Sequence, residues 1–342
     1  MTKRAVSPAV ITALLLFGAG ALDTPALAGA ACTAGERPLN FGFYAFFAPL
    51  SYSADEDPDS PGFNTHLGFE ADLVSALEAM PGAGLAFTRR PIAEWDDIWL
   101  RPAGPRYDLV GGGITILESR TRDPAGWRKI AFTAGHIAFR QSLLVRAEDA
   151  QRLARYDALG GEVRVGALAA TTGEARLLQL TGLADRAGIL AAGVRVDTPR
   201  GRVTADGSPD YFIAAAAESP GLAGRRHLHP PSGRMPQVIY LGDSGGEAEL
   251  LEALARRRID AIARGEIGNR AAARASDGAF AVTAIDAEHE LGGFALAVED
   301  AALRACLDEK IDYLTDHRRI GYAAWLEDPE VFMRRAVQWR AE

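Results

Sequence analysis

The 342-residue chain has little that would place it in a membrane or on nucleic acid. Its only long apolar run lies at the extreme N-terminus, and the mean hydropathy of −0.03 excludes a polytopic membrane protein. Lys and Arg together number 37 against 45 Asp and Glu, so the net charge of −8 disfavours a phosphate backbone as a partner. The sequence has no P-loop and no nucleophile–base pair. With 48% hydrophobic and 24% charged residues, the composition excludes disordered and fibrous chains and indicates a globular protein long enough for two domains.

The first residues have the pattern of an export signal. Lys3 and Arg4 give a basic start, and residues 9–22 form an apolar run too short to span a bilayer comfortably. Small residues follow, so we expect a signal peptide over residues 1–28, cleaved after Ala28 or a residue or two later. An uncleaved membrane anchor is the alternative.

Cysteine is scarce, with only Cys32 and Cys306 in the chain. An even pair in an exported protein favours a disulfide, here one that joins the N-terminal segment to a helix near the C-terminus. Two unpaired thiols are the alternative.

Hydrophobic periodicity alternates between strands and helices after Pro38. This order favours an α/β protein with mostly parallel sheets. We expect strands over residues 39–44, 85–88, 107–115, 142–146, 163–168, 259–263 and 293–298. We expect helices over residues 68–80, 95–101, 172–180, 247–257, 301–316 and 323–339.

Two helix starts carry a recognisable cap. Ser244 and Glu247 form a capping box before the helix expected over residues 247–257, and Thr171 and Glu174 form another directly after the strand expected over residues 163–168. Free N–H groups and the positive end of the helix dipole would make this point a candidate anion site, with an ordinary cap as the alternative.

Pro and Gly cluster over residues 197–236, which we interpret as an irregular insertion. It contains His227 and His229, and two histidines at this spacing could ligate a metal ion. No cysteine or acidic residue flanks them, so we expect exposed loop histidines and no metal site.

Several stretches, in order along the chain, resemble a known family. They are LGFEADLVSALE (67–78), DLVGGGITILESR (108–120), VRVGALAATTGEARL (163–177), ALARRRIDAIA (253–263) and the C-terminal DEKIDYLTDHRRIGYAAWLEDPE. Together they resemble the bacterial extracellular solute-binding proteins of the polar amino-acid type (family 3). The first carries that family's glycine, aromatic and two acids as Gly68, Phe69, Glu70 and Asp72.

The resemblance implies an α/β, two-lobed type II periplasmic binding protein fold with a central cleft and a two-segment hinge. Lobe one would comprise residues 38–137 plus 285–342, and lobe two residues 138–284 with the insertion at 197–236. The hinge segments would lie near residues 135–140 and 282–292, and the ligand would bind between lobes that close on it.

The resemblance also implies how a ligand would be held. Arg120 matches the arginine that grips the ligand carboxylate, a task suited to a planar guanidinium. Gly113 and Thr115 precede it in the same turn, and Thr171 and Thr172 match residues that meet the carboxylate from the second lobe. Aromatic side chains that match the family's stacking residues are Phe47 and Trp95.

Two positions depart from the family pattern. The aspartate that would hold a ligand ammonium is replaced by Gly265, with Glu266 beside it as a possible substitute. A polar position in the first loop aligns with Tyr44. The ligand is therefore either an amino acid held by Glu266 or a carboxylate without an α-amine.

The resemblance implies a periplasmic receptor that binds a small carboxylate-bearing solute and delivers it to an ABC permease in the inner membrane. No cofactor or metal is expected, and the protein is expected to be a monomer. Two alternatives stay open. One is a cyclohexadienyl dehydratase-like enzyme that uses Glu266 as general acid, and the other is a ligand sensor that docks onto a membrane receptor.

Overall fold

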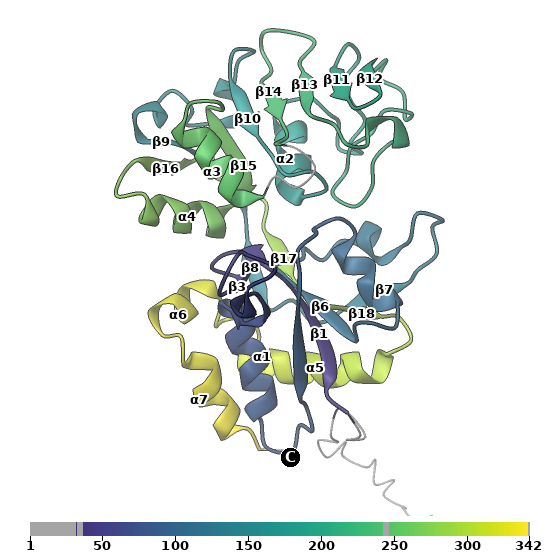
Figure 1. The fold of residues 1–342 in the computed structure, drawn as a ribbon, viewed down its shortest axis with the longest axis vertical. Coiled ribbons are helices and arrows are strands. Elements are labelled where there is room, and N and C mark those ends of the chain that lie inside the picture. The colour runs from purple at the N-terminus through teal and green to yellow at the C-terminus, as the bar shows by residue number, and fades with distance from the viewer. Residues whose placement is uncertain (1–31, 33–36, 242–245, 341–342) are drawn as a thin grey trace, which may run out of the picture.

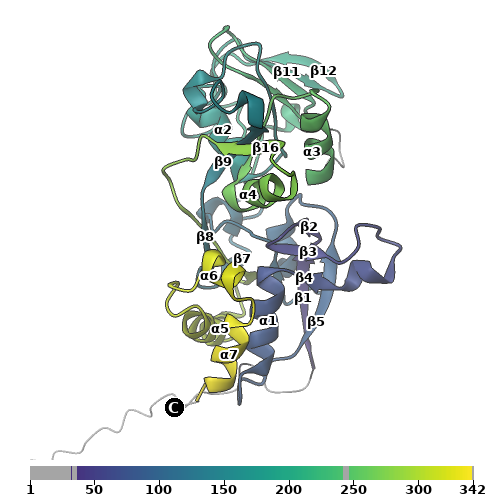
Figure 2. The same ribbon diagram turned by 90° about the vertical axis from the view of Figure 1, so that its left-hand side faces the viewer.

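The computed structural model describes residues 32, 37–241 and 246–340, and the predicted signal peptide (1–28) and Ser244 lie outside them. Two β-sheets with their helices form two lobes, one above the other, joined by a narrow waist (Figures 1 and 2). Among the described residues, no helix combines the length and the apolar character that crossing a bilayer requires.

Lobe one is built on a five-stranded sheet with β1 (Leu39–Tyr44) near its middle. The strand order is β5-β1-β6-β18-β7, and β1 runs parallel to both neighbours. Phe41 and Phe43 on β1 are fully buried against the helices on one face of the sheet (Figure 2). The other strands of this lobe are β5 (Phe87–Ile92), β6 (Leu109–Gly111), β7 (Ile130–Phe132) and β18 (Ala295–Ala297), with a small sheet of β2 (Phe46–Phe47), β3 (Ser51–Ser53) and β4 (His66–Leu67).

The helices of lobe one cover the sheet with apolar faces. In α1 (Phe69–Ala79), Phe69, Leu73 and Leu77 recur every four residues and are fully buried. The helix starts after Gly68, whose φ of 103° suits glycine, and a Cβ there would lie 2.5 Å from the carbonyl oxygen of Pro49. The remaining α-helices are α5 (Ala301–Leu314), α6 (Tyr322–Glu327) and α7 (Val331–Gln338).

Lobe two is built on an eight-stranded mixed sheet in the order β12-β11-β13-β14-β10-β15-β9-β16. The central strand β10 runs parallel to β14 and β15, and the other pairs are antiparallel. The strands are β9 (Gln141–Arg146), β10 (Arg164–Gly166), β11 (Arg195–Thr198), β12 (Gly201–Thr204), β13 (His227–His229), β14 (Gln237–Ile239), β15 (Ala261–Gly265) and β16 (Phe280–Thr283). The helices are α2 (Thr172–Leu180), α3 (Glu247–Ala255) and α4 (Glu266–Ala275).

The chain crosses the waist on two short strands. β8 (Ile137–Phe139) leads from lobe one to lobe two, and β17 (Glu290–Gly292) returns. The two strands pair antiparallel, so the connection is a two-stranded ribbon. Short 3₁₀ helices occur at Pro61–Asn64, Ile98–Ala103, Glu118–Thr121, Ala147–Asp149, Tyr156–Ala158 and Pro220–Leu222.

The predicted disulfide is present between Cys32 and Cys306 on α5. The backbone N–H of Cys32 also donates to the carbonyl oxygen of Ala83, at 2.8 Å. Cys32 is therefore fastened to lobe one. A disulfide suits an extracellular or periplasmic protein.

Several expectations about secondary structure were wrong. Antiparallel strand pairs outnumber parallel ones, so the sheets are not mostly parallel, and the helix expected over residues 95–101 is a 3₁₀ helix at Ile98–Ala103. Residues 197–236 are not wholly irregular, because they contribute β12 and β13 to the second sheet, and His227 and His229 lie on β13 rather than in a loop. The helix expected over residues 323–339 is two helices, separated at Asp328 and Pro329. Helix α4 was not predicted, because four of its five apolar residues are alanines, which mark a buried face only weakly.

Candidate functional site

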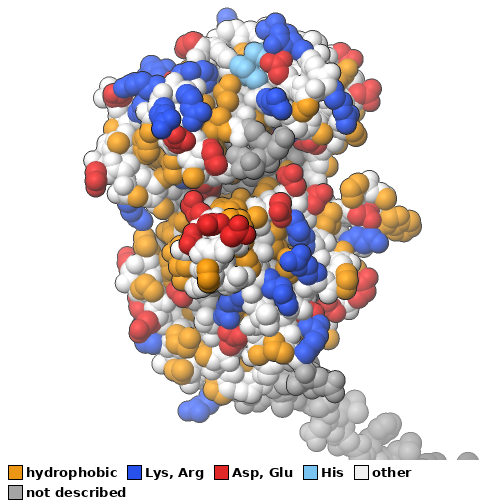
Figure 3. Space-filling model, in the orientation of Figure 1, with side chains coloured by type: hydrophobic (Ala, Val, Ile, Leu, Met, Phe, Trp, Pro, Cys, Tyr) orange, Lys and Arg blue, Asp and Glu red, His pale blue; other side chains and the backbone are white. Residues whose placement is uncertain are grey.

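A cavity of about 60 Å³ lies between the two lobes and is walled by both. Figure 3 shows that the molecular surface is indented where the two lobes meet. Sites for small molecules usually measure roughly 300–1,000 Å³, so this cavity is smaller than a typical ligand site. The lining residues are Tyr44, Phe47, Trp95, Gly113, Thr115, Phe139, Gln141, Leu168, Thr171, Thr172, Gly173, Glu247, Arg264 and Gly265.

The structure brings most of the predicted ligand-binding residues to this one cavity. They arrive from the end of β1, from the turn after β6 and from the start of α2, which are far apart in the sequence. Arg120 and Glu266 are the predicted residues that do not line it. A larger open hollow, near Arg146 on the outer end of lobe two, contains none of the predicted residues.

Aromatic rings form the lobe-one wall of the cavity. Tyr44 and Trp95 meet edge to face, with ring centroids 5.1 Å apart. Burial raises the pKa of the Tyr44 phenol, so this hydroxyl is neutral at physiological pH. The indole N–H of Trp95 donates to the carbonyl oxygen of Ala170 in lobe two, at 3.0 Å. This wall is therefore hydrogen-bonded to the opposite lobe.

Glu70, from the start of α1, fixes the glycine turn after β6. Its fully buried carboxylate accepts hydrogen bonds from the N–H groups of Gly112 (2.6 Å) and Gly113 (3.0 Å), and it pairs with Nε2 of His136 at 2.9 Å. Gly113 has φ of 69°, and a Cβ there would lie 2.5 Å from the side chain of Leu50. This turn therefore requires both glycine and the buried acid beneath it.

A polar network lies at the hinge side of the cavity. Glu290 on β17 accepts from the hydroxyl of Thr115 (3.0 Å) and from Nε2 of Gln141 (3.0 Å). The same Nε2 also donates to the hydroxyl of Thr172, at 2.9 Å. No donor among the described residues reaches the buried Oε1 of Gln141. The network therefore leaves one buried acceptor on a lining residue without a protein partner in the described part of the chain.

The N-terminus of α2 faces the cavity from lobe two. The predicted cap is present, because Thr171 Oγ1 accepts from the N–H of Glu174 at 3.1 Å. Thr172 and Gly173 occupy the first helical positions, where backbone N–H groups have no partner within the helix. Hydroxyls and free N–H groups at the positive end of a helix dipole suit an anion such as a carboxylate.

Arg120 lies behind the cavity rather than in its lining. It is 1% exposed, and its guanidinium donates to the carbonyl oxygens of Thr115 (3.2 Å), Ala170 (3.2 Å) and Ala215 (3.0 Å). Burial lowers its pKa to about 9, so it keeps its charge at neutral pH. Because Ala170 and Ala215 belong to lobe two, Arg120 hydrogen-bonds the two lobes together in this structure.

Two charged residues of the lining were missed in the sequence. Arg264, at the end of β15, has Nη1 2.5 Å from Oε2 of Glu247 at the start of α3. Burial raises the pKa of Glu247, and Arg264 opposes that rise. Arg264 follows a strand that had been predicted, and the carboxyl ends of parallel strands meet at one edge of a sheet. That rule could have singled out Arg264, whereas Glu247 looked like an ordinary helix-start acid.

Glu266 faces away from the cavity. Its carboxylate accepts from Nε of Arg140 at 3.1 Å and from Nε of Arg270 at 2.6 Å. Both oxygens are thus paired with arginines of lobe two. The position expected to hold a ligand ammonium is Gly265, which carries no acid, and the lining side chains that could accept from an ammonium include Gln141 and Glu247.

Comparison with family models and with curated protein sequences finds no match. Solved structures do match along most of the chain. The amino acid ABC transporter substrate-binding protein AbpA from Streptococcus pneumoniae, bound to L-arginine, matches with a TM-score of 0.57 at 14% identity, covering 88% of this chain and 96% of that one.

Two reconstructed ancestral proteins match similarly. An ancestral arginine-binding protein bound to arginine has a TM-score of 0.55 at 15% identity, with coverage of 89% and 99%. An ancestral amino acid-binding protein, described as a precursor of cyclohexadienyl dehydratase, has a TM-score of 0.55 at 17% identity, with coverage of 88% and 95%. These likenesses show the fold: the chain has the two-lobed α/β architecture of type II periplasmic binding proteins, as predicted.

Proposed function

We propose that the chain is a periplasmic receptor that captures a small carboxylate-bearing solute, an amino acid or a close relative, and delivers it to an ABC importer. One observation carries the proposal. Residues that the sequence marked as ligand-binding, drawn from distant segments of both lobes, line a single cavity between them. The likeness to substrate-binding proteins that hold amino acids supports the same assignment.

The lining suggests how a zwitterion would be oriented. The carboxylate would lie at the N-terminus of α2, against the N–H groups of Thr172 and Gly173. The ammonium would face acceptors on the other side, namely Oε1 of Gln141 and the carboxylate of Glu247. Tyr44 and Trp95 would cover the rest of the solute with their rings.

Arg120 would act through closure of the lobes. Separation of the lobes breaks its bonds to Ala170 and Ala215 and leaves a buried cation with free donors. A solute carboxylate that approaches the open cleft can accept those donors, as the resemblance implies. Binding would then replace the hydrogen bonds from Arg120 to lobe two with hydrogen bonds from Arg120 to the solute. The solute would favour the arrangement of the lobes in which it contacts both of them.

A ligand screen on the mature protein, residues 29–342, tests the proposal. The panel contains the proteinogenic amino acids, their deaminated carboxylate analogues and their decarboxylated amines. Binding of each compound is measured by thermal shift and by calorimetry. We expect a concentration-dependent rise in melting temperature for at least one carboxylate and none for the matching amine. Binding of amines alone, or no binding across the panel by a protein that folds, would contradict it.

A second candidate is a lyase on the same fold, and the observation that favours it is Glu247. A buried cleft acid whose pKa is raised can donate a proton to a leaving group. The same panel should include prephenate, with product followed by absorbance. Turnover that is lost in Glu247→Gln would favour the enzyme, and binding of solute without any product favours the receptor.

A further inference from the structure

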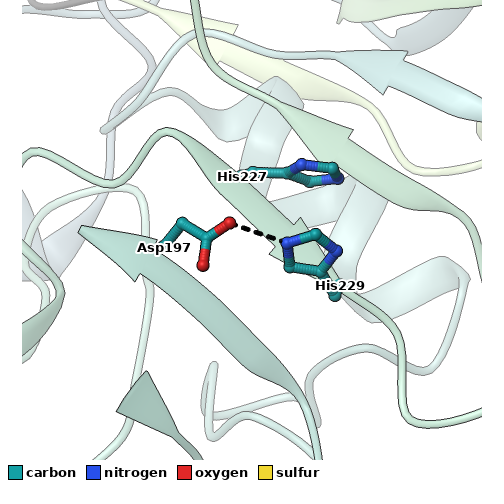
Figure 4. Close-up of side chains that lie close together, drawn as sticks. All are labelled: Asp197, His227 and His229. Atoms are coloured by element: carbon teal, nitrogen blue, oxygen red, sulfur yellow. Dashed lines mark hydrogen bonds and ion pairs between the residues drawn. The ribbon is translucent and has the colours of Figure 1, made fainter. Parts of the chain in front are cut away.

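Three potential metal ligands converge on the edge of the second sheet, away from the cleft. Asp197 lies on β11, and His227 and His229 lie on the neighbouring antiparallel strand β13. Residues two apart on a strand point to the same face, so the two imidazoles stack, with ring centroids 3.7 Å apart. Figure 4 shows the Asp197 carboxylate turned toward both rings.

The three side chains are close enough to share one ion. Each offers one ligand atom, and these atoms lie within 4.8 Å of one another. Asp197 is directly opposite His227 in the strand register, while its Oδ2 is 2.8 Å from Nε2 of His229. All three residues are half-buried, so the site is anchored by the sheet and still open to solvent.

A neighbouring amide orients one of the imidazoles. The side-chain NH₂ of Gln237 donates to the carbonyl oxygen of Gly161 at 2.8 Å, which turns its Oε1 toward Nε2 of His227 at 2.9 Å. Nε2 of His227 must then carry the proton, and in the neutral ring Nδ1 keeps a lone pair. Outer hydrogen bonds of this kind fix the tautomer of metal-binding histidines.

A neighbouring arginine also contacts the Asp197 carboxylate. Arg202 is half-exposed and donates to both oxygens of Asp197, from Nε to Oδ1 at 2.6 Å and from Nη2 to Oδ2 at 3.1 Å. An ion that binds Nε2 of His229 displaces the proton on that nitrogen, so the lone pair of Oδ2 that faces His229 becomes available to the ion.

We propose that Asp197, His227 and His229 form a binding site for a divalent transition-metal ion of the zinc class, with two imidazole nitrogens and one carboxylate oxygen as ligands. Imidazole ligands suit zinc, copper and nickel rather than magnesium or calcium. Three protein ligands leave a coordination position for water or for a group from another molecule. The site shares no residue with the cavity lining, so a test of metal binding is independent of the proposed receptor function.

Sequence spacing could not reveal this site. His229 and Asp197 are 32 residues apart, and no acidic residue flanks the histidine pair. Antiparallel pairing of β11 with β13 supplies the carboxylate. The expectation of exposed loop histidines missed it because residues 197–236 were interpreted as irregular.

Titration of the tag-free mature protein with zinc chloride, followed by calorimetry and by competition with a colorimetric chelator, tests the proposal. We expect one zinc ion per chain. His227→Ala, His229→Ala and Asp197→Asn should each weaken binding by at least roughly tenfold, and Gln237→Leu by roughly 10–100-fold. Arg202→Gln should strengthen binding, because a competing cation is removed.

The matched control is the double variant His289→Ala, His317→Ala, which removes two exposed histidines elsewhere and should bind zinc as the parent does. Circular dichroism checks that each variant folds. If His227→Ala does not fold, the zinc affinities of Asp197→Asn and Gln237→Leu test the site instead. The proposal is overturned if the parent takes up no stoichiometric zinc, or if the control loses zinc while the cluster variants keep it.

Discussion

The buried carboxylate of Glu70 accepts a hydrogen bond of 3.0 Å from the backbone N–H of Gly113, so the first helix of lobe one directly supports the wall of the cleft. The other oxygen of the Glu70 carboxylate accepts from the backbone N–H of Gly112. His136, just before β8 at the start of the waist, also pairs with this carboxylate. Geometry at the cavity therefore depends on a residue that does not touch it.

Replacement of Glu70 by Gln should loosen that wall. The amide keeps one acceptor but turns an NH₂ group toward a backbone N–H, so one buried donor loses its partner. Such a loss costs about 1–3 kcal/mol, and we expect urea unfolding to report a decrease of this size. Glu299→Gln, at an exposed glutamate, is the control and should leave stability unchanged. Equal stability of the two variants would contradict the role of Glu70.

Replacement of Arg120 should affect both closure and binding. Arg120→Lys keeps a positive charge but cannot donate to Thr115, Ala170 and Ala215 together. We expect a larger radius of gyration by small-angle scattering and at least roughly tenfold weaker binding of the solute identified by screening, equivalent to about 1.4 kcal/mol.

Arg122→Ala is the matched control for Arg120, because Arg122 is half-exposed and lies two residues along the same segment. It should bind like the parent. Unchanged affinity in Arg120→Lys would remove Arg120 from the binding mechanism, and an unchanged radius would show that its bonds do not hold the lobes together.

Acid should destabilise the protein through His66. Burial lowers the pKa of this histidine to about 3, from an ordinary value near 6.5 in the unfolded chain. Below pH 6.5, His66 therefore binds a proton in the unfolded state but not in the folded state. Stability is fully present above pH 6.5 and falls by about 1.4 kcal/mol per pH unit below it, so about 2 kcal/mol is lost by pH 5.

The variant His66→Phe isolates that contribution. Phenylalanine retains the stacking on Phe43, where the ring centroids are 4.1 Å apart, but cannot titrate. Urea unfolding at pH 7 and pH 5 should show a smaller acid effect than in the parent, whereas exposed His289→Gln should not change it. An identical pH dependence in His66→Phe and parent would refute the assignment.

Removal of the disulfide should weaken lobe one. Cys32 and Cys306 are 274 residues apart, so their bond restricts nearly the whole unfolded chain. We expect the double Cys→Ser variant to lose about 2–5 kcal/mol of unfolding free energy. Reductant should lower the stability of the parent and leave the variant unaffected. If reductant lowered both alike, the disulfide would not be the cause.

The sequence predicted those parts of the molecule that depend on local pattern. The apolar spacing of Phe69, Leu73 and Leu77 predicted α1, and Thr171 predicted the start of α2. Arg264 and Glu247 escaped notice, because their importance depends on the approach of β15 to α3 across the sheet edge. Pairings between distant segments are set by tertiary packing, which leaves no periodic trace in a single sequence.

The likeness to a known family predicted residues of the cavity but not all of their partners. It identified Arg120 without the carbonyl groups of Ala170 and Ala215, since backbone acceptors have no signature in a sequence. It also favoured Glu266, whose neighbours Arg140 and Arg270 turn its carboxylate away from the cleft.

The order of strands sets the order in which the chain can mature. All strands of the second sheet come from one continuous segment, residues 141–283, so that sheet can form as soon as the segment has been synthesised. The first sheet cannot be completed until β18, residues 295–297, inserts between β6 and β7. Lobe one is therefore the first to begin in the sequence and the last to complete its sheet. Until β18 is in place, the unpaired edges of β6 and β7 are exposed to other proteins near the nascent chain.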